Sequence, residues 1–125
     1  MLFRSIGCTI CYDLRFPELY QALQKKNVDA IVVPAAFTLA TGKDHWEVLL
    51  RARAIETESY VLAAAQCGTF AKGQRATYGH SLVVDPWGHV VARASDGIGF
   101  VSARLKPELV KTVRAQIPVA QHKVL

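Results

Sequence analysis

Short apolar runs alternate with segments of helical periodicity along the first half of the chain. Continuous apolar runs of about four to eight residues are typical of strands that are buried on both faces of a sheet. We therefore predict strands at residues 5–11, 29–34 and 60–66. Between them, apolar residues recur at helical spacing and predict helices at residues 17–26 and 43–58. This order of elements is typical of parallel βαβ units.

The second of these helices carries the clearest local signals. Thr41 and Asp44 form a capping-box pattern, in which each side chain satisfies a free backbone N–H at the helix start. Two pairs of opposite charge at helical spacing follow and are typical of an exposed helix face: Glu47 with Arg51, and Arg53 with Glu56. We expect both pairs to support the helix from its surface.

The second half of the chain has the pattern of an antiparallel meander. Ser81–Arg93 consists of two apolar runs around Asp85-Pro-Trp-Gly88, where the Asp, Pro and Gly positions favour a type I turn. We predict a hairpin there. The other segments are predicted as a polar loop, a strand, a helix and a tail without a pattern, at residues 69–79, 100–105, 107–116 and 118–125 respectively. We therefore interpret residues 1–125 as one α/β unit with a mixed sheet.

Composition and charge argue against several classes of protein. The chain has 125 residues, 51% of them apolar and 20% charged, as expected for an ordered globular domain. Its net charge of +5 is spread over single basic residues, so we predict no nucleic-acid binding. No apolar stretch reaches the roughly 18 residues of a membrane span, and residues 1–5 leave no room for a cleavable leader. Three cysteines, an odd number, indicate free thiols in a reducing compartment, the cytoplasm or the mitochondrion.

Cys11 is the candidate nucleophile of this chain. It ends an apolar run and is followed by a polar segment that leads into the helix at Pro17. A buried strand would thus hold the thiol where the strand becomes exposed, although a cysteine in such a run can also be a small buried hydrophobic residue. Strand alternation predicts that Cys11 shares a face with Gly7 and Thr9, and that Cys8 points the other way.

Cys8 and Cys11 also have the spacing of a Cys-x-x-Cys motif. A redox pair needs two neighbouring sulfurs at a helix start, whereas these two are predicted on opposite faces of a strand. A structural zinc site needs four ligands, and Cys67 with the four histidines provides no second close pair. We therefore predict no metal site and no cofactor.

Several motifs, taken in order, resemble those of the nitrilase superfamily, the carbon–nitrogen hydrolases. Ile10-Cys-Tyr-Asp-Leu-Arg-Phe-Pro-Glu18 resembles the nucleophile motif of that family. The other matching segments are Pro34-Ala-Ala-Phe37, His45-Trp-Glu-Val-Leu-Leu-Arg-Ala-Arg-Ala-Ile-Glu56, Tyr60-Val-Leu-Ala-Ala-Ala-Gln66, Tyr78-Gly-His-Ser81 and Asp85-Pro-Trp-Gly88. The resemblance extends over nearly the whole chain, and the motifs together are similar to those of the Nit branch of the superfamily.

The resemblance implies an αββα sandwich and a Glu–Lys–Cys triad that hydrolyses a small linear amide, such as an α-keto ω-amide, through a thioester. It makes Cys11 the nucleophile and the backbone N–H of Tyr12 a part of the oxyanion site. Phe37 and Glu47 are candidates for the substrate side of the pocket, because the segment after the second predicted strand would border Cys11. His80 suits a structural hydrogen-bonding role better than that of a base.

The Glu and Lys of the triad lie upstream of the nucleophile in these enzymes, and none of the ten residues before Cys11 is Glu or Lys. The chain thus resembles the C-terminal half of the sandwich, and we expect residues 1–125 to form a partial carbon–nitrogen hydrolase domain with unpaired sheet edges. We expect negligible turnover by the chain alone, and a homo-oligomer or association with full-length subunits. The alternative is a non-catalytic truncated homologue that persists through such association.

Overall fold

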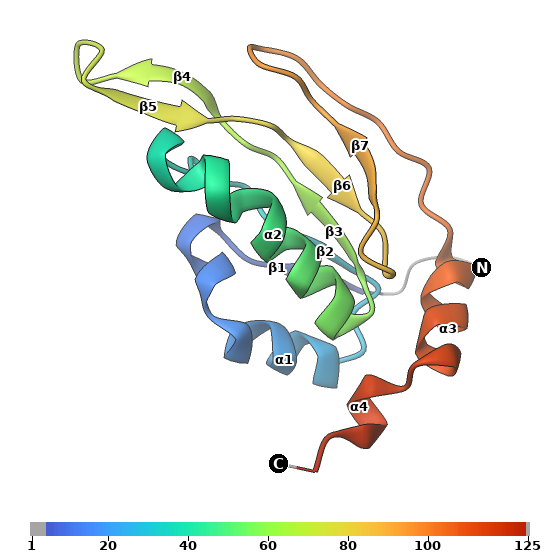
Figure 1. Ribbon diagram of the computed structural model, residues 1–125. Helices are drawn as coiled ribbons and strands as arrows, with labels where there is room; N and C mark the ends of the chain where they lie inside the picture. The colour runs from blue at the N-terminus through green and yellow to red at the C-terminus, as the bar shows by residue number, and fades with distance from the viewer. Residues whose placement is uncertain (1–4, 125) are drawn as a thin grey trace.

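A five-stranded mixed sheet organises the computed structural model, which describes residues 5–124 (Figure 1). The strands lie in the order β1 (Ile6–Cys8), β2 (Ala30–Val32), β3 (Tyr60–Ala63), β6 (Leu82–Val84) and β7 (Val90–Arg93). The first three are parallel, and β3, β6 and β7 pair antiparallel. The predicted mixed sheet, parallel in the first half of the chain and antiparallel in the second, is confirmed.

Helices cover the two faces of this sheet to different extents. The helices α1 (Pro17–Lys25) and α2 (Leu39–Thr57) lie together over one face, where they form the main hydrophobic core (Figure 1). Trp46 and Leu50 of α2 are fully buried there. The helix α3 (Pro107–Gln116), at the bounds predicted from the sequence, packs through Val110 against the opposite face, and the short helix α4 (Val119–His122) follows it.

The helix α2 begins four residues earlier than the sequence predicts, so the capping box at Thr41 is wrong. Its N-cap is Thr38, and Thr41 lies within the helix. Gly42, which reads as a helix breaker, allows close packing here, because a Cβ at this position would come within 2.3 Å of the Tyr78 Cβ. The first turn of α2 therefore packs closely against Tyr78, a residue from another part of the chain.

The predicted polar loop at residues 69–79 is also wrong. The structure has a hairpin of β4 (Cys67–Phe70) and β5 (Arg75–Tyr78), which projects from the end of the main sheet (Figure 1). Its loop, residues 71–74, places Ala71, Lys72 and Gly73 at positive φ. Two-residue hairpin turns are signalled by Asn-Gly or Asp-Gly; this longer loop has only Gly73, a weaker signal that the polar composition of the segment hid.

The hairpin of β6 and β7 has the type I turn that the sequence predicts. Asp85 accepts hydrogen bonds through its Oδ1 from the N–H groups of Trp87 and His89, each at 2.9 Å, and its carbonyl accepts one from Gly88. The strand predicted at residues 100–105 is wrong. Ala103 and Leu105 pack against the α3 side of the sheet, but the segment has no ladder partner among residues 5–124.

Two expectations concern the ends of the chain. The prediction about a leader rests mainly on residues 1–4, which lie outside the described part. The tail predicted without a pattern contains α4. Over the residues that the structure describes, every helix is too short or too polar to cross a bilayer.

Candidate active site

Cys11 does not lie in a strand, and this corrects the sequence prediction. The strand β1 ends at Cys8, and Cys11 opens a 3-10 turn, η1 (Cys11–Arg15). Its φ is +45°, a left-handed conformation that is uncommon for a residue with a Cβ. Its backbone N–H donates to the Pro34 carbonyl at 2.8 Å, which ties the turn to the segment after β2. A strained backbone of this kind is often found at functional sites.

Side chains on the α1 side hold the segment that leads into this turn. Thr9 is buried and donates to the Val32 carbonyl at 3.1 Å, and the Tyr20 hydroxyl of α1 donates to Thr9 Oγ1 at 2.9 Å. Burial raises the pKa of Tyr20, against the hydrogen bond with Thr9, which lowers it. The tyrosine therefore remains a neutral donor that fixes the residues just before Cys11.

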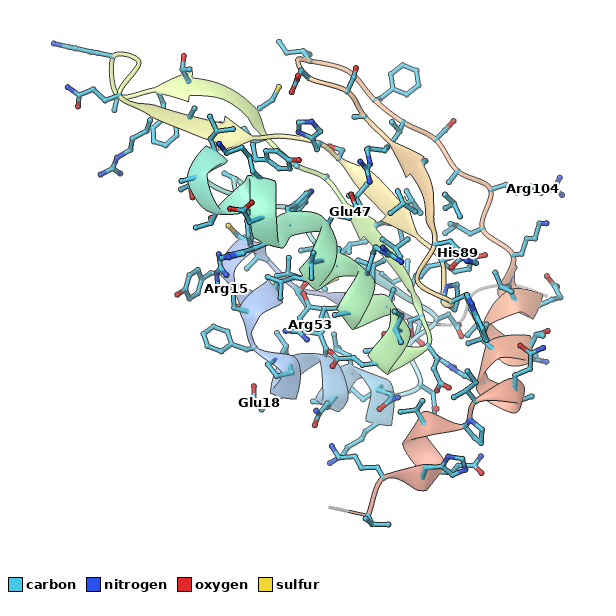
Figure 2. All side chains as sticks on the ribbon, viewed as in Figure 1. Arg15, Glu18, Glu47, Arg53, His89 and Arg104 are labelled. Carbon is cyan, nitrogen blue, oxygen red and sulfur yellow. The ribbon has the colours of Figure 1, made fainter. Side chains whose placement is uncertain are left out.

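Arg53 holds the turn from its other side. Its Nε donates to the Leu14 carbonyl at 3.0 Å, its Nη1 donates to Glu56 Oε1 at 3.0 Å, and its guanidinium lies 5.1 Å from the Tyr20 ring centre. The side chain is only 7% exposed, so this pair is not the surface pair that the sequence predicts (Figure 2). Burial raises the pKa of Glu56, although the charge of Arg53 opposes that rise.

Two adjacent hollows meet at Cys11. The first has a volume of about 460 Å³ and is lined by Cys11, Tyr12, Arg15, Ala36, Phe37, Thr38, Thr41 and His45. The second has a volume of about 540 Å³ and is lined by Ile10, Cys11, Pro34, Ala35, Ala36, Ala64, Ala65, Gln66 and Ser81. Both lie where the parallel strands end, which is the usual place for ligands in open α/β sheets.

Arg15 provides the positive charge of the first hollow. Its guanidinium lies 5.5 Å from the ring centre of Tyr12 and 5.1 Å from that of Phe37, and its Nη1 is 3.2 Å from His45 Nδ1. Arg15, Thr41 and His45 are pocket residues that the sequence did not indicate as such. Arg15 stands in the quoted nucleophile motif, and its position four residues after Cys11 was the available signal.

The predicted site residues are distributed unequally around this pocket. Tyr12 and Phe37 both line the first hollow with Cys11. As the second residue of η1, Tyr12 carries an N–H that the turn itself does not use. Glu47 lines neither hollow; its carboxylate pairs with Arg93 of β7, well away from Arg15 (Figure 2).

His80 has the structural contacts that the sequence favours for it. Its ring stacks on Tyr78 with centroids 4.1 Å apart, and its carbonyl accepts a hydrogen bond from Trp46 Nε1 at 2.9 Å. All three cysteines are free. Within residues 5–124, no group of three or more His, Cys, Asp or Glu side chains is arranged to hold a metal ion.

Fold and site together define an α/β protein with two hollows at the carboxyl ends of parallel strands. The family model described as carbon-nitrogen hydrolase matches residues 2–115, and the chain belongs to this family. It is 56% identical over 119 residues to the deaminated glutathione amidase of Bos taurus. The resemblance to the nitrilase superfamily is therefore confirmed.

Solved structures agree with this assignment. The C. elegans NitFhit protein superposes with a TM-score of 0.92 at 49% identity over 95% of this chain. Saccharomyces cerevisiae Nit3, described as a member of branch 10 of the nitrilase superfamily, gives 0.87 at 37% identity over 96% of this chain. The chain spans 36% of the length of the bovine relative, 29% of NitFhit and 44% of Nit3.

Proposed function

We propose that this protein serves amide hydrolysis through Cys11. The thiol loses its proton as its sulfur attacks the amide carbonyl carbon and forms a C–S bond. The amide nitrogen takes up a proton in exchange, and the C–N bond of the tetrahedral intermediate then breaks to release ammonia. Water hydrolyses the resulting thioester, which yields the carboxylic acid and restores the thiol. The N–H of Tyr12 donates to the oxyanion in both steps.

One observation carries this proposal: Cys11 adopts a left-handed conformation where two hollows meet. A cysteine that only filled space in the core would need neither the strained φ nor contact with a cavity. The hydrogen bonds of Thr9 and Arg53 on either side stabilise a conformation that costs about 1–3 kcal/mol by itself. This support favours a nucleophile over a structural cysteine.

The first hollow favours a small linear amide with an anionic end. Arg15 offers a planar, permanently charged group that suits a carboxylate, and Phe37 and Tyr12 flank it with apolar surface. An α-keto ω-amide has a carboxylate at one end and the scissile amide at the other. We propose this class of substrate, with the carboxylate on Arg15 and the amide carbon at Cys11.

We further propose that the 125-residue chain alone turns over amides negligibly. The resemblance requires a Glu and a Lys upstream of the nucleophile, and residues 1–10 contain neither. Glu18 is exposed at the start of α1, and Glu47 pairs with Arg93. We therefore assign the role of the missing catalytic Glu to neither of them. Loss of a general base typically lowers a rate by about 10²–10⁴-fold.

Alkylation kinetics test the nucleophile. Iodoacetamide, followed by peptide mapping at low conversion, should modify Cys11 faster than Cys8, although Cys8 is the more exposed of the two. Unfolding the protein in urea should remove the difference between the two alkylation rates. Faster reaction at Cys8 in the folded protein would overturn the assignment of Cys11.

Ammonia release tests the activity of the chain alone. With a short α-keto ω-amide, we expect the wild type to release no more ammonia than Cys11→Ala. Cys8→Ala is the matched control, because it removes a thiol from β1 and leaves Cys11 in place. Release that depends on Cys11 and not on Cys8 would contradict the proposed inactivity.

The open edge of the sheet favours a second candidate function, that of a non-catalytic chain which associates with full-length subunits or with its own copies. Ile6 and Ile10 are 61% and 63% exposed, and β1 is an edge strand. Size exclusion at micromolar concentration should show an oligomer, or co-elution with a full-length Nit-branch subunit. A compact monomer that does not co-elute with such a subunit would count against this candidate function.

A further inference from the structure

The first hollow contains a contact between Arg15 and His45 that the proposed reaction does not use. Arg15 of η1 and His45 of α2 are 30 residues apart in the sequence, yet Arg15 Nη1 lies 3.2 Å from His45 Nδ1. Both residues line the hollow that contains Cys11. His45 is exposed, so the contact is not a requirement of the buried core.

The chemistry of the two side chains decides the direction of this hydrogen bond. A guanidinium has five N–H donors and no acceptor. His45 Nδ1 therefore accepts in this hydrogen bond, in the tautomer that carries the ring proton on Nε2. The bond uses one guanidinium N–H and leaves others for a bound carboxylate.

The aromatic neighbours restrict the guanidinium further. It lies between the rings of Tyr12 and Phe37, at 5.5 Å and 5.1 Å from their centres. The two rings limit movement toward either side but do not fix the direction in which the N–H groups point. An arginine side chain has many rotamers, and only a directional acceptor such as His45 Nδ1 selects one of them.

We propose that His45 is a positioning residue, which orients Arg15 to bind the anionic end of the substrate beside Cys11. The inference rests on the proposed function, because it assigns a support to the anion site of that function. His45 acts through Arg15 and has no contact with the reacting atoms. Its imidazole serves as a hydrogen-bond acceptor, so an acceptor of the same reach at this position should replace it.

Two alkylating agents of similar size test this without any need for turnover. Iodoacetate is anionic and iodoacetamide is neutral, and each gives up iodide to the same thiolate. The ratio of their rate constants at Cys11 therefore reports the positive charge beside the thiol and cancels changes in thiol ionisation. Peptide mapping resolves the three cysteines, and the ratio at Cys8, outside both hollows, is the internal reference.

We expect the ratio to be higher at Cys11 than at Cys8, and Arg15→Gln should lower it by about two- to fivefold, the span for a half-exposed pair of charges. His45→Ala should lower it by a similar factor, and His45→Asn, which keeps an acceptor near the position of Nδ1, should retain most of it. The Cys8 ratio and the urea midpoint should not move in any variant.

The outcomes separate this inference from the proposed function. If Arg15→Gln lowers the ratio but His45→Ala does not, the positioning role is overturned and the anion site remains. If His45→Asn lowers the rate ratio at Cys11 as much as His45→Ala does, an acceptor role for His45 is wrong. If the wild-type ratio at Cys11 does not exceed that at Cys8, the anion site on Arg15 falls, and the positioning role falls with it.

Discussion

The two faces of β1 and the residues just after it differ sharply, although alternate residues of one short segment make them. On the face under α1, Gly7 packs so closely that an added Cβ would lie 3.0 Å from Leu23 Cδ1, and Thr9 is hydrogen-bonded and buried. On the other face, Ile6, Cys8 and Ile10 are exposed. Hydrogen bonds on the covered face hold the residues just before Cys11, while the open face exposes apolar side chains to solvent.

This difference teaches where the stability of the candidate site comes from. Tyr20 and Arg53, which hold the residues on either side of Cys11, both belong to the covered side, and the Pro34 carbonyl adds a hydrogen bond from the end of β2. We therefore expect substitutions on the covered face to change both stability and the reactivity of Cys11. Those on the open face should change association alone.

The largest expected effect is that of Trp46→Ala. Trp46 is fully buried, lies 4.9 Å from the Phe37 ring centre and donates to the His80 carbonyl. Its removal should lower the free energy of unfolding by about 3–5 kcal/mol, measured by urea denaturation. Val48→Ala, at a 66% exposed position of the same helix, is the control and should cost below about 0.5 kcal/mol. Equal losses in the two variants would contradict the importance of the covered face.

The next effect is that of Arg53→Met. It leaves the carbonyl of buried Leu14 and the half-buried carboxylate of Glu56 without their partner, and we expect the free energy of unfolding to fall by about 2–4 kcal/mol. The selectivity of iodoacetamide for Cys11 over Cys8 should fall as well. Arg51→Met is the matched control: Arg51 is exposed and donates to the Gly88 carbonyl of a distant turn.

A double variant separates the two tasks of Arg53. In Arg53→Met combined with Glu56→Gln, no unpaired charge is left at position 56, but the hydrogen bond to the Leu14 carbonyl is still missing. We expect it to recover part of the stability and none of the Cys11 selectivity. Recovery of both would show that the ion pair, rather than the bond to the turn, holds Cys11.

A smaller effect concerns pH. Burial raises the pKa of Glu56 above its ordinary value of 4.5, so the folded protein holds this proton more tightly than the unfolded chain does. The resulting stabilisation is complete below the unfolded pKa and is lost as the pH rises through the folded one. Relative to Glu56→Gln, the wild type should therefore become less stable from about pH 4 upward. Urea midpoints measured between about pH 3.5 and 7 check the sign, and a rise would contradict it.

The smallest effect on stability is expected from Ile6→Ser on the open face. Because Ile6 is 61% exposed, the free energy of unfolding of the monomer should change by less than about 0.5 kcal/mol. Its elution volume should nevertheless shift toward the monomer if this face supports association. A loss of stability comparable with that of Trp46→Ala would show that the open face is structural too.

Local patterns predicted some elements well and others badly, for physical reasons. The helix α3 and the turn at Asp85 follow from proline, spacing and turn chemistry within a few residues. The segment 100–105 has the alternation of a strand, yet a strand exists only where a neighbour supplies the ladder. The β4–β5 hairpin has only Gly73 as a turn signal, and the pairing of its strands stabilises Ala71 and Lys72 at positive φ.

The candidate site divides in the same way. The motif around Cys11 pointed to the nucleophile, to Tyr12 and to the family, because the order of these residues is a property of the chain alone. Phe37 lines the first hollow with Cys11, where counting strands places it, and its part in binding a substrate stays a prediction. Glu47 was placed there by the same counting, but the face that a helical residue presents depends on how the helix packs, and its carboxylate pairs with Arg93.

The sequence by itself thus determined the class of fold, the family and the identity of the candidate nucleophile, since all three are carried by local order and spacing. Only the tertiary structure decided that Cys11 is left-handed, that Arg53 is buried and that Arg15 meets His45. The partners that produce these features lie 23 to 39 positions away along the chain. Hydrogen bonds over such separations form only when the sheet and α2 have packed, so no local pattern can contain them.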